Sequence, residues 1–175
     1  MPTNTTTVRA PDPPKSSKPL RVTSSSFSEG SKIDTTYAFQ GCGGQNVSPQ
    51  LSWSGAPEGT KSYAITCFDP DAPTGSGYWH WLAFDIPASV TSLNEGAGNQ
   101  SPAGGTSATN DYGTVGYGGP CPPKGDIDHH YVFTVYALDV EKLEGPTQKT
   151  TGASLVFMMR RHLLATGRIT GTFSH

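Results

Sequence analysis

Residues 61–86 read KSYAITCFDPDAPTGSGYWHWLAFDI, and this stretch contains two of the strongest strand patterns of the chain. It begins with an expected strand over Lys61–Phe68 and ends with a second over Trp79–Ile86. Side chains alternate between the two faces of a strand, and both faces of each segment are largely apolar. The sequence therefore predicts two central strands joined across a polar turn. On strict alternation, His80 shares a face with Leu82 and Phe84.

Further strands follow from the same kind of pattern. Tyr131–Leu138 alternates aromatic and β-branched residues and is the clearest of them. Shorter strands are predicted at Leu20–Phe27, Leu51–Trp53 and Arg168–Phe173. One helix is predicted over Thr151–Thr166, where apolar residues recur at helical spacing before a glycine that suits a helix end. We therefore expect a mainly β fold with a C-terminal helix.

Composition agrees with this fold class. The 175 residues include 21 Gly and 15 Pro, against 12 Lys and Arg and 14 Asp and Glu, which favours short strands joined by turns. The length fits one domain, and a net charge of −2 without a basic patch argues against a nucleic-acid partner. Residues 1–18 are rich in Pro, Thr and Ser and are expected to form a disordered arm before a domain over 19–175.

The chain contains no apolar stretch near the ~20 residues required to span a bilayer. Its polar, Thr-rich start has no secretory leader pattern, so a cytoplasmic location is expected. Of the three cysteines, Cys67 lies in a strand pattern and is expected in the core. Cys42 and Cys121 lie in loops rich in Gly and Pro, where two free thiols are favoured over a disulfide. No pair has C-x-x-C spacing, so no structural zinc site is expected.

Candidate chemistry gathers where the two central strands meet the turn. Asp69 ends the first strand and His80 lies near the start of the second, so a hairpin would bring both to one sheet edge. His129 and Tyr131 share a face of the third strand, while His130 points away. Together these side chains offer hydrogen-bond donors and one carboxylate, which suits a small anion such as phosphate.

Other readings of the same residues stay open at this point. Each side chain also fits a turn, a core position or a strand surface. Asp69 and His80 would serve as an acid–base pair in a weak hydrolase, and Asp69, His80 and His129 would imitate a two-histidine, one-carboxylate metal triad. Cys121 beside His129 would suggest a thiol nucleophile. The sequence has no G-x-S-x-G elbow, P-loop or dinucleotide fingerprint.

Two long motifs carry a family resemblance. The first runs from Asp69–Pro73 through Gly77–Trp81, and the second from Tyr117–Gly125 through His129–Tyr131. With Ser48–Trp53 and the C-terminal helix expected to end at Leu164–Gly167, they make the chain, over roughly residues 20–173, resemble the phosphatidylethanolamine-binding protein family. The resemblance is nearest to its bacterial and archaeal branch, which is called Raf-kinase-inhibitor-like.

The resemblance implies two antiparallel sheets with a small anion-binding pocket at one end. It implies that Asp69, His80, His129 and Tyr131 line the pocket, with some X-Pro bonds cis. The remaining ligand-binding candidates, at its rim and beside it, are Pro70, Asp71, Pro73, Trp79, Pro122 and Pro123. Family members bind phosphate-type anions and phospholipid headgroups, some inhibit serine proteases, and some mammalian members inhibit a protein kinase.

We therefore expect a regulatory or inhibitory binding protein rather than an enzyme, with no cofactor and no metal. The alternatives are a serine protease or kinase inhibitor that acts through surface loops and, third, the weak hydrolase. A homodimer is a further expectation from bacterial relatives. One departure concerns His130, which stands where the family commonly has arginine; a salt bridge behind the pocket is expected to be lost. The longer C-terminal extension of eukaryotic members is also absent.

Overall fold

The computed structural model describes residues 11–15 and 17–175. The arm predicted for residues 1–18 lies largely outside them. In chain order the elements are β1 (Arg21–Thr23), η1 (Thr35–Tyr37), η2 (Gln40–Cys42), β2 (Leu51–Ser54), β3 (Ser62–Asp69), β4 (Tyr78–Pro87), β5 (Ser92–Leu93), η3 (Ala97–Asn99), η4 (Pro102–Gly104), β6 (Thr106–Ser107), β7 (His129–Leu138), α1 (Gly152–Met159) and β8 (Leu163–Phe173).

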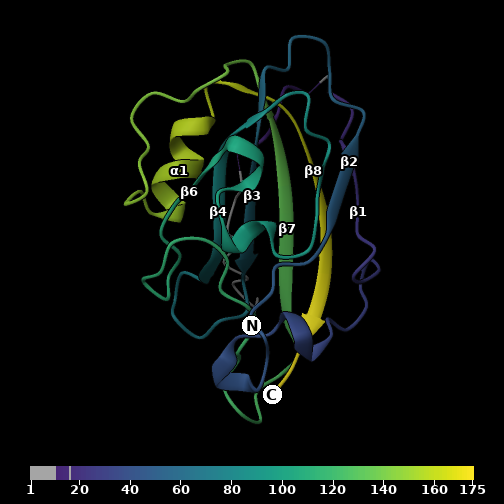
Figure 1. The fold of residues 1–175 in the computed structure, drawn as a ribbon, viewed down its shortest axis with the longest axis vertical. Coiled ribbons are helices and arrows are strands. Elements are labelled where there is room, and N and C mark those ends of the chain that lie inside the picture. Colours follow the sequence, from purple (N-terminus) through teal and green to yellow (C-terminus); the bar gives the residue numbers. More distant parts are fainter. Residues whose placement is uncertain (1–10, 16) are drawn as a thin grey trace, which may run out of the picture.

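The strands form two antiparallel sheets, as expected. The larger sheet has the order β6-β4-β3-β7-β8, and the smaller has the order β1-β2-β5. Figure 1 shows α1 on one side of the large sheet and strands β1 and β2 on the other. Strand β3 pairs with β4 and with β7, which confirms its predicted central position.

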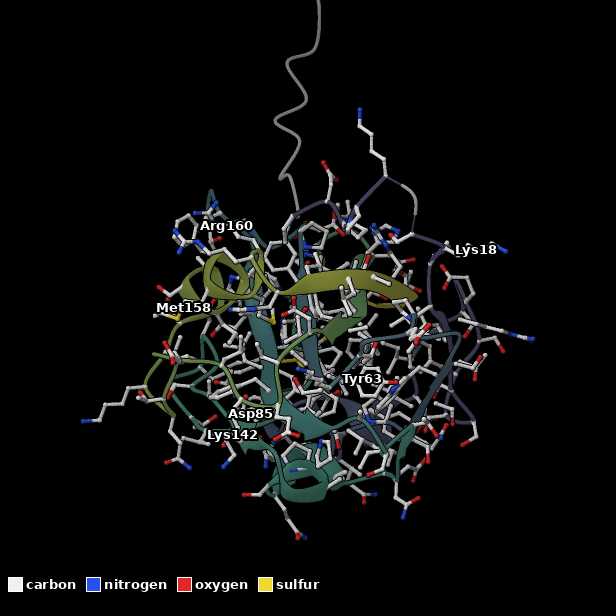
Figure 2. The ribbon with its side chains drawn as sticks, turned by 90° about the horizontal axis from the view of Figure 1, so that it is seen from above. Lys18, Tyr63, Asp85, Lys142, Met158 and Arg160 are labelled. Carbon is white, nitrogen blue, oxygen red and sulfur yellow. A yellow bond between two sulfur atoms is a disulfide. The ribbon has the colours of Figure 1, made fainter. Side chains whose placement is uncertain are left out.

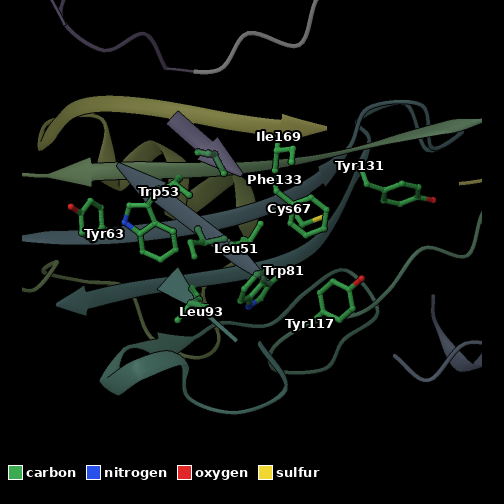
Figure 3. Close-up of a cluster of buried hydrophobic side chains, with 14 of the residues drawn as sticks. Leu51, Trp53, Tyr63, Cys67, Trp81, Leu93, Tyr117, Tyr131, Phe133 and Ile169 are labelled. Atoms are coloured by element: carbon green, nitrogen blue, oxygen red, sulfur yellow. The ribbon is translucent and has the colours of Figure 1, made fainter. Parts of the chain in front are cut away.

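Two cores explain why the central strands are apolar on both faces. One core, between the sheets, contains Ile65, Trp81 and Phe133 of the large sheet and Leu51 and Trp53 of the small one. Figure 3 shows Trp81 and Phe133 beside Leu51 and Trp53 in this core. The other core lies under α1. Its members are Ala64, Leu82, Phe84, Ala108, Tyr136, Leu138, Leu143, Leu155, Met159 and Leu163. Figure 2 shows Met158 and Arg160 on the outer side of the helix segment.

A β-bulge interrupts the pairing of β3 with β4 near the turn. Cys67 pairs with Trp81, but the next residue, Phe68, pairs with Trp79. His80 is therefore the extra residue on β4. A bulge shifts the alternation of side chains by one position, so the prediction that His80 shares a face with Leu82 is wrong.

The C-terminal helix is shorter than predicted. Helix α1 covers Gly152–Met159, and the residues from Leu163 onward belong to β8, which pairs along β7. Alternate residues of β8 are buried, so the apolar pattern at this end is that of a strand. Gly167 lies inside the strand, where a Cβ would overlap the Leu20 carbonyl; it does not cap a helix.

Two further predictions are wrong. Cys42 and Cys121 form a disulfide, with Cα atoms 5.4 Å apart across 79 residues of sequence, rather than two free thiols. Sequence spacing alone does not show that the two loops meet. All peptide bonds among the described residues are trans, including those expected to be cis. Cys67 is a buried free cysteine, as predicted.

Candidate functional site

The β3–β4 hairpin brings the predicted residues to one end of the large sheet. Asp69, the last residue of β3, pairs with Tyr78, the first of β4. Strand β7 begins beside them with His129 and Tyr131. Asp69, His80, His129 and Tyr131 are each at most 3% exposed. The structure therefore gathers the four predicted side chains in a buried polar group, which we call the Asp69 cluster.

Asp69 accepts hydrogen bonds both from the turn that follows β3 and from β7. Its Oδ1 accepts hydrogen bonds from the backbone N–H groups of Asp71 (2.8 Å) and Ala72 (3.1 Å). Its Oδ2 accepts one from His129 Nδ1 (2.7 Å). Asp and Asn side chains often fold back in this way onto the backbone two residues on. The carboxylate is consequently fixed in position by three donors.

His129 lies between two carboxylates. Its second ring nitrogen, Nε2, is 3.1 Å from Oδ2 of Asp126 in the loop before β7. Burial disfavours the charged ring, but the hydrogen bonds to Asp69 and Asp126 outweigh this and raise the pKa of His129. When protonated, the imidazolium donates from both nitrogens, so neither is left for a ligand while Asp126 stays in place.

His80 behaves in the opposite way. Its Nδ1 donates to the carbonyl of Gly118 at 2.8 Å, so in the neutral ring Nε2 is an acceptor. Burial lowers the pKa of His80 more than the nearby hydrogen bonds and Asp69 raise it. Because of the bulge, the ring lies with its centroid 5.0 Å from that of Tyr131. Two neighbouring histidines thus favour different protonation states near neutral pH.

The Tyr131 hydroxyl is the unsatisfied group of the cluster. It is buried and forms no hydrogen bond of good geometry among the described residues, although the Asp69 carboxylate lies close enough to act on it. Burial raises the pKa of Tyr131, and the Asp69 charge adds to the effect, so the hydroxyl keeps its proton. Figure 3 shows Tyr131 at the end of the inter-sheet core, with its oxygen pointing away from Cys67 and Phe133. A buried hydroxyl without a partner needs an explanation, of which a bound ligand is one.

Sequence reasoning missed two neighbours of this cluster. Tyr112 has its ring centroid 5.5 Å from His80 and 5.1 Å from Tyr78, and its hydroxyl donates to the Gly119 carbonyl at 2.8 Å. Asp126 was missed as well. Both lie in loops without strand periodicity, so no pattern indicated which way their side chains point.

The remaining predicted residues differ in exposure and in their distance from the Asp69 cluster. Pro70, Pro73 and Pro123 are exposed, Pro122 is buried, and Asp71 is partly exposed. Asp71 Oδ2 lies 2.7 Å from Nδ1 of His130, so the histidine that replaces the family's arginine still forms a polar pair. The Trp79 ring packs with the core under α1 and against Phe68, with centroids 4.4 Å apart. The structure does not bring that ring into the Asp69 cluster.

The geometry also bears on the alternative chemistries. Asp69 contacts His129 rather than His80, so the expected acid–base pair is not formed. Within the described part of the chain, Asp69, His80 and His129 do not converge as a three-ligand metal site. Cys121 is in a disulfide and offers no thiol nucleophile.

Two surface hollows lie elsewhere. One, of about 230 Å³, is lined by residues of β1 and β2. The other, of about 480 Å³, has Asp85 and Lys142 among the residues that line it, and Figure 2 shows these two near each other. None of the four Asp69-cluster residues lines either hollow.

Comparison with known proteins establishes the family. The sequence profile of the phosphatidylethanolamine-binding protein family matches residues 23–174. The chain belongs to this family. It is 47% identical over 161 residues to YbcL of Escherichia coli K12, a match that covers 88% of this chain and 87% of YbcL. YbhB of the same organism is 41% identical over 160 residues, with 89% of this chain and all of YbhB covered.

Solved structures agree with the family assignment. The crystal structure of E. coli YbcL, described as a new member of the mammalian PEBP family, aligns with a TM-score of 0.86 at 44% identity over 90% of this chain and 99% of that one. A carboxypeptidase Y inhibitor in complex with its cognate proteinase aligns with a TM-score of 0.50 at 22% identity, over 87% of this chain and 81% of that one. This last likeness shows the fold alone. In the described residues, none of the helices has the length and apolar character for a membrane span.

Proposed function

We propose that this phosphatidylethanolamine-binding protein family member binds a phosphate-type anion, free or as a phospholipid headgroup, at the Asp69 cluster. The observation that carries the proposal is the buried, unpartnered hydroxyl of Tyr131 beside His80. A phosphate oxygen would accept a hydrogen bond from the hydroxyl and remove the cost of leaving this donor unsatisfied, which is about 1–3 kcal/mol.

The charge of the cluster sets a condition on binding. Asp69 and Asp126 are each negative when ionised, and a protonated His129 balances only one of them. His80 is neutral near pH 7 because burial lowers its pKa. An anion would therefore meet net negative charge. Binding is favoured when His80 takes up a proton and when Asp126 leaves His129 Nε2 free to donate.

Isothermal titration tests this proposal directly. Inorganic phosphate and phosphorylethanolamine are titrated at about pH 6 and about pH 8, on either side of the ordinary histidine pKa of ~6.5. We expect tighter binding at the lower pH, with proton uptake revealed by buffers of different ionisation enthalpy. His80→Gln is expected to remove that uptake. His162→Ala is the control, because His162 pairs with Asp139 on another part of the surface.

The two ligands distinguish free phosphate from a headgroup. Equal affinity for both indicates that the phosphate group alone is recognised, whereas tighter binding of phosphorylethanolamine indicates that the ammonium is also contacted. Absence of heat for both ligands at both pH values would reject the proposal. Affinity that does not change with pH would reject the role of His80 protonation.

A second candidate function, inhibition of a serine protease or kinase, is favoured by exposed apolar side chains on the loops near the cluster. Val115 is 50% exposed and Ile127 is 65% exposed. An apolar side chain on a loop suits insertion into a protease specificity pocket. Chymotrypsin- and elastase-type proteases are assayed at micromolar protein, with Ile127→Ser as the comparison. No inhibition by the unaltered protein would count against this candidate.

The disulfide bears on where such a protein acts. Disulfides persist in oxidising compartments and are rare in the cytosol. The Cys42–Cys121 bond therefore supports an oxidising compartment rather than the cytoplasm expected from the sequence. Fractionation of the native organism, with thiol alkylation before lysis, tests the location and the bond together.

A further inference from the structure

A histidine lies beside the disulfide. His175 Nδ1 is 3.2 Å from Cys42 Sγ. Among the described residues, the two sulfurs and this nitrogen are the one set of three His, Cys or carboxylate ligand atoms that lie within 4.8 Å of one another. Cys42 and Cys121 are partly exposed and His175 is exposed, so solvent reaches all three.

Three separate parts of the chain hold these ligands. Cys42 ends helix η2. Cys121 follows Pro120, whose carbonyl accepts a hydrogen bond from Phe39 N–H at 2.9 Å. Figure 1 shows the C-terminus beside the blue segment that contains η2. The three ligands therefore converge because the fold places them there.

The backbone of His175 is itself held in place. A main-chain oxygen of His175 accepts a hydrogen bond from Gly125 N–H at 3.1 Å. Two residues earlier, β8 still pairs with β7, where Phe173 lies opposite His129. His175 is thus held near the sulfurs by backbone contacts that do not involve its ring.

The ligand types point to a thiophilic metal. Two thiolates and an imidazole are the donors that Zn²⁺ takes in proteins, at ~2.3 Å for sulfur and ~2.0 Å for nitrogen. Mg²⁺ and Ca²⁺ prefer oxygen ligands instead. In a tetrahedral site the sulfurs would stand about 3.8 Å apart, which partly exposed cysteines reach by side-chain rotation.

We propose that Cys42, Cys121 and His175 form a zinc site when the disulfide is reduced. A dithiol reductant supplies two electrons and two protons, which break the S–S bond to give two thiols, while the reductant becomes a disulfide. Zn²⁺ then binds both sulfurs and Nδ1 of neutral His175, and the two thiol protons are released to solvent. Water completes the fourth position. The oxidised protein holds no such ion because its sulfurs are bonded to each other.

The two states keep the same loops together. The disulfide joins the loop at residues 40–44 to the segment at 118–123, and a zinc ion would join the same two segments and add the C-terminus. This inference does not depend on anion binding at the Asp69 cluster, because none of the three ligands belongs to that cluster.

The test uses the full-length protein reduced with a phosphine, which leaves no competing thiol. Zn²⁺ is titrated against a chromophoric chelator, and Co²⁺ is added separately as a spectroscopic probe. We expect one tightly bound ion in the reduced protein, with thiolate-to-cobalt charge-transfer absorption, and none in the oxidised protein. His175→Ala is expected to weaken binding by about tenfold or more, since even supporting residues cost that much.

Two controls make the result decisive. His162→Ala removes another partly exposed histidine and should leave zinc affinity unchanged. Cys42→Ser should abolish binding and the charge-transfer band, and circular dichroism verifies that it stays folded. A reduced protein that binds no zinc, or a cobalt spectrum without thiolate absorption, would overturn the proposal. Equal zinc affinity in His175→Ala would also overturn it, because the imidazole would then not be a ligand.

Discussion

His129 Nδ1 and Asp69 Oδ2 are 2.7 Å apart, and their side chains are 1% and 3% exposed. This buried pair joins the last residue of β3 to the first residue of β7. Removing one member of a buried pair is costly because the other is left without compensation. The pair therefore ties the shape of the candidate site to the stability of the sheet end.

Asp69→Asn should separate these two roles. The amide can still accept hydrogen bonds from the turn through one oxygen, but it no longer balances a charged His129. We expect a loss of about 2 kcal/mol in the free energy of unfolding near pH 6 and a fall in the pKa of His129. Chemical denaturation and NMR titration of the ring measure the two effects. Asp128→Asn, on an exposed residue directly before β7, is the control; an unchanged His129 pKa in Asp69→Asn would contradict the prediction.

The two cluster histidines should give stability a maximum with pH. The pKa of His129 is raised in the folded state, so its contribution is fully present below the unfolded pKa of ~6.5 and is lost as pH rises through the folded pKa. The pKa of His80 is lowered, so the unfolded chain binds more protons and stability falls as pH drops below ~6.5.

Urea denaturation at several pH values between about 5 and about 9 tests this prediction across the histidine range. His129→Gln should flatten the alkaline side of the profile, and His80→Gln should flatten the acidic side. If each variant retained the wild-type slope on its own side, the assignment of the two opposite shifts would be wrong.

Tyr131→Phe should distinguish a binding residue from a core residue. The hydroxyl forms no hydrogen bond of good geometry, so its removal should leave stability unchanged or raise it by up to about 1 kcal/mol, while weakening phosphate binding. Tyr136→Phe is the matched control, because that buried hydroxyl lies 3.1 Å from Thr66 Oγ1 and its loss should cost about 1 kcal/mol. Tyr131→Ala, by contrast, should cost about 3–5 kcal/mol through the cavity it leaves. A clear loss of stability in Tyr131→Phe would mean that its hydroxyl has a structural partner.

The sequence predicted the large sheet well because alternation in β3, β4 and β7 is strong and both faces are apolar. The direction of the His80 side chain was not predictable, because a bulge arises from pairing between strands and leaves no local pattern. The boundary between α1 and β8 was missed because apolar spacing fits a helix and a strand equally over a few residues. The disulfide depends on loop placement, which no residue spacing reveals. Family motifs, rather than periodicity, identified the Asp69 cluster.

Gly152→Ala should destabilise the protein although alanine favours helices. A Cβ at this position would overlap the Trp79 ring, which is packed under the first turn of α1. We expect a cost of about 1–3 kcal/mol from overpacking, measured by thermal denaturation. Ser154→Ala, on an exposed residue of the same helix, should change stability by less than about 0.5 kcal/mol. A Gly152→Ala protein with the same stability as the unaltered protein would show that the Trp79 indole can move aside.

Asp126→Asn should strengthen anion binding if the Asp69 cluster is the site. Asp126 Oδ2 lies 3.1 Å from His129 Nε2, and the hydrogen bond to His129 lowers the pKa of Asp126. This carboxylate therefore holds the donor that an incoming phosphate needs, and it adds a like charge. Near pH 6, where His129 is protonated, we expect phosphate affinity to rise several-fold. This corresponds to about 1 kcal/mol of binding free energy.

Asp128→Asn makes the same change in net charge two residues away and serves as the control. A gain confined to Asp126→Asn would mean that the carboxylate competes directly with the anion for His129. An equal gain in both variants would mean that the higher affinity comes from the change in net charge and not from the contact between Asp126 and His129. Unchanged or weaker binding in Asp126→Asn would show that the anion does not reach His129 Nε2, and the ligand contacts would then have to be sought at His80 and Tyr131 alone.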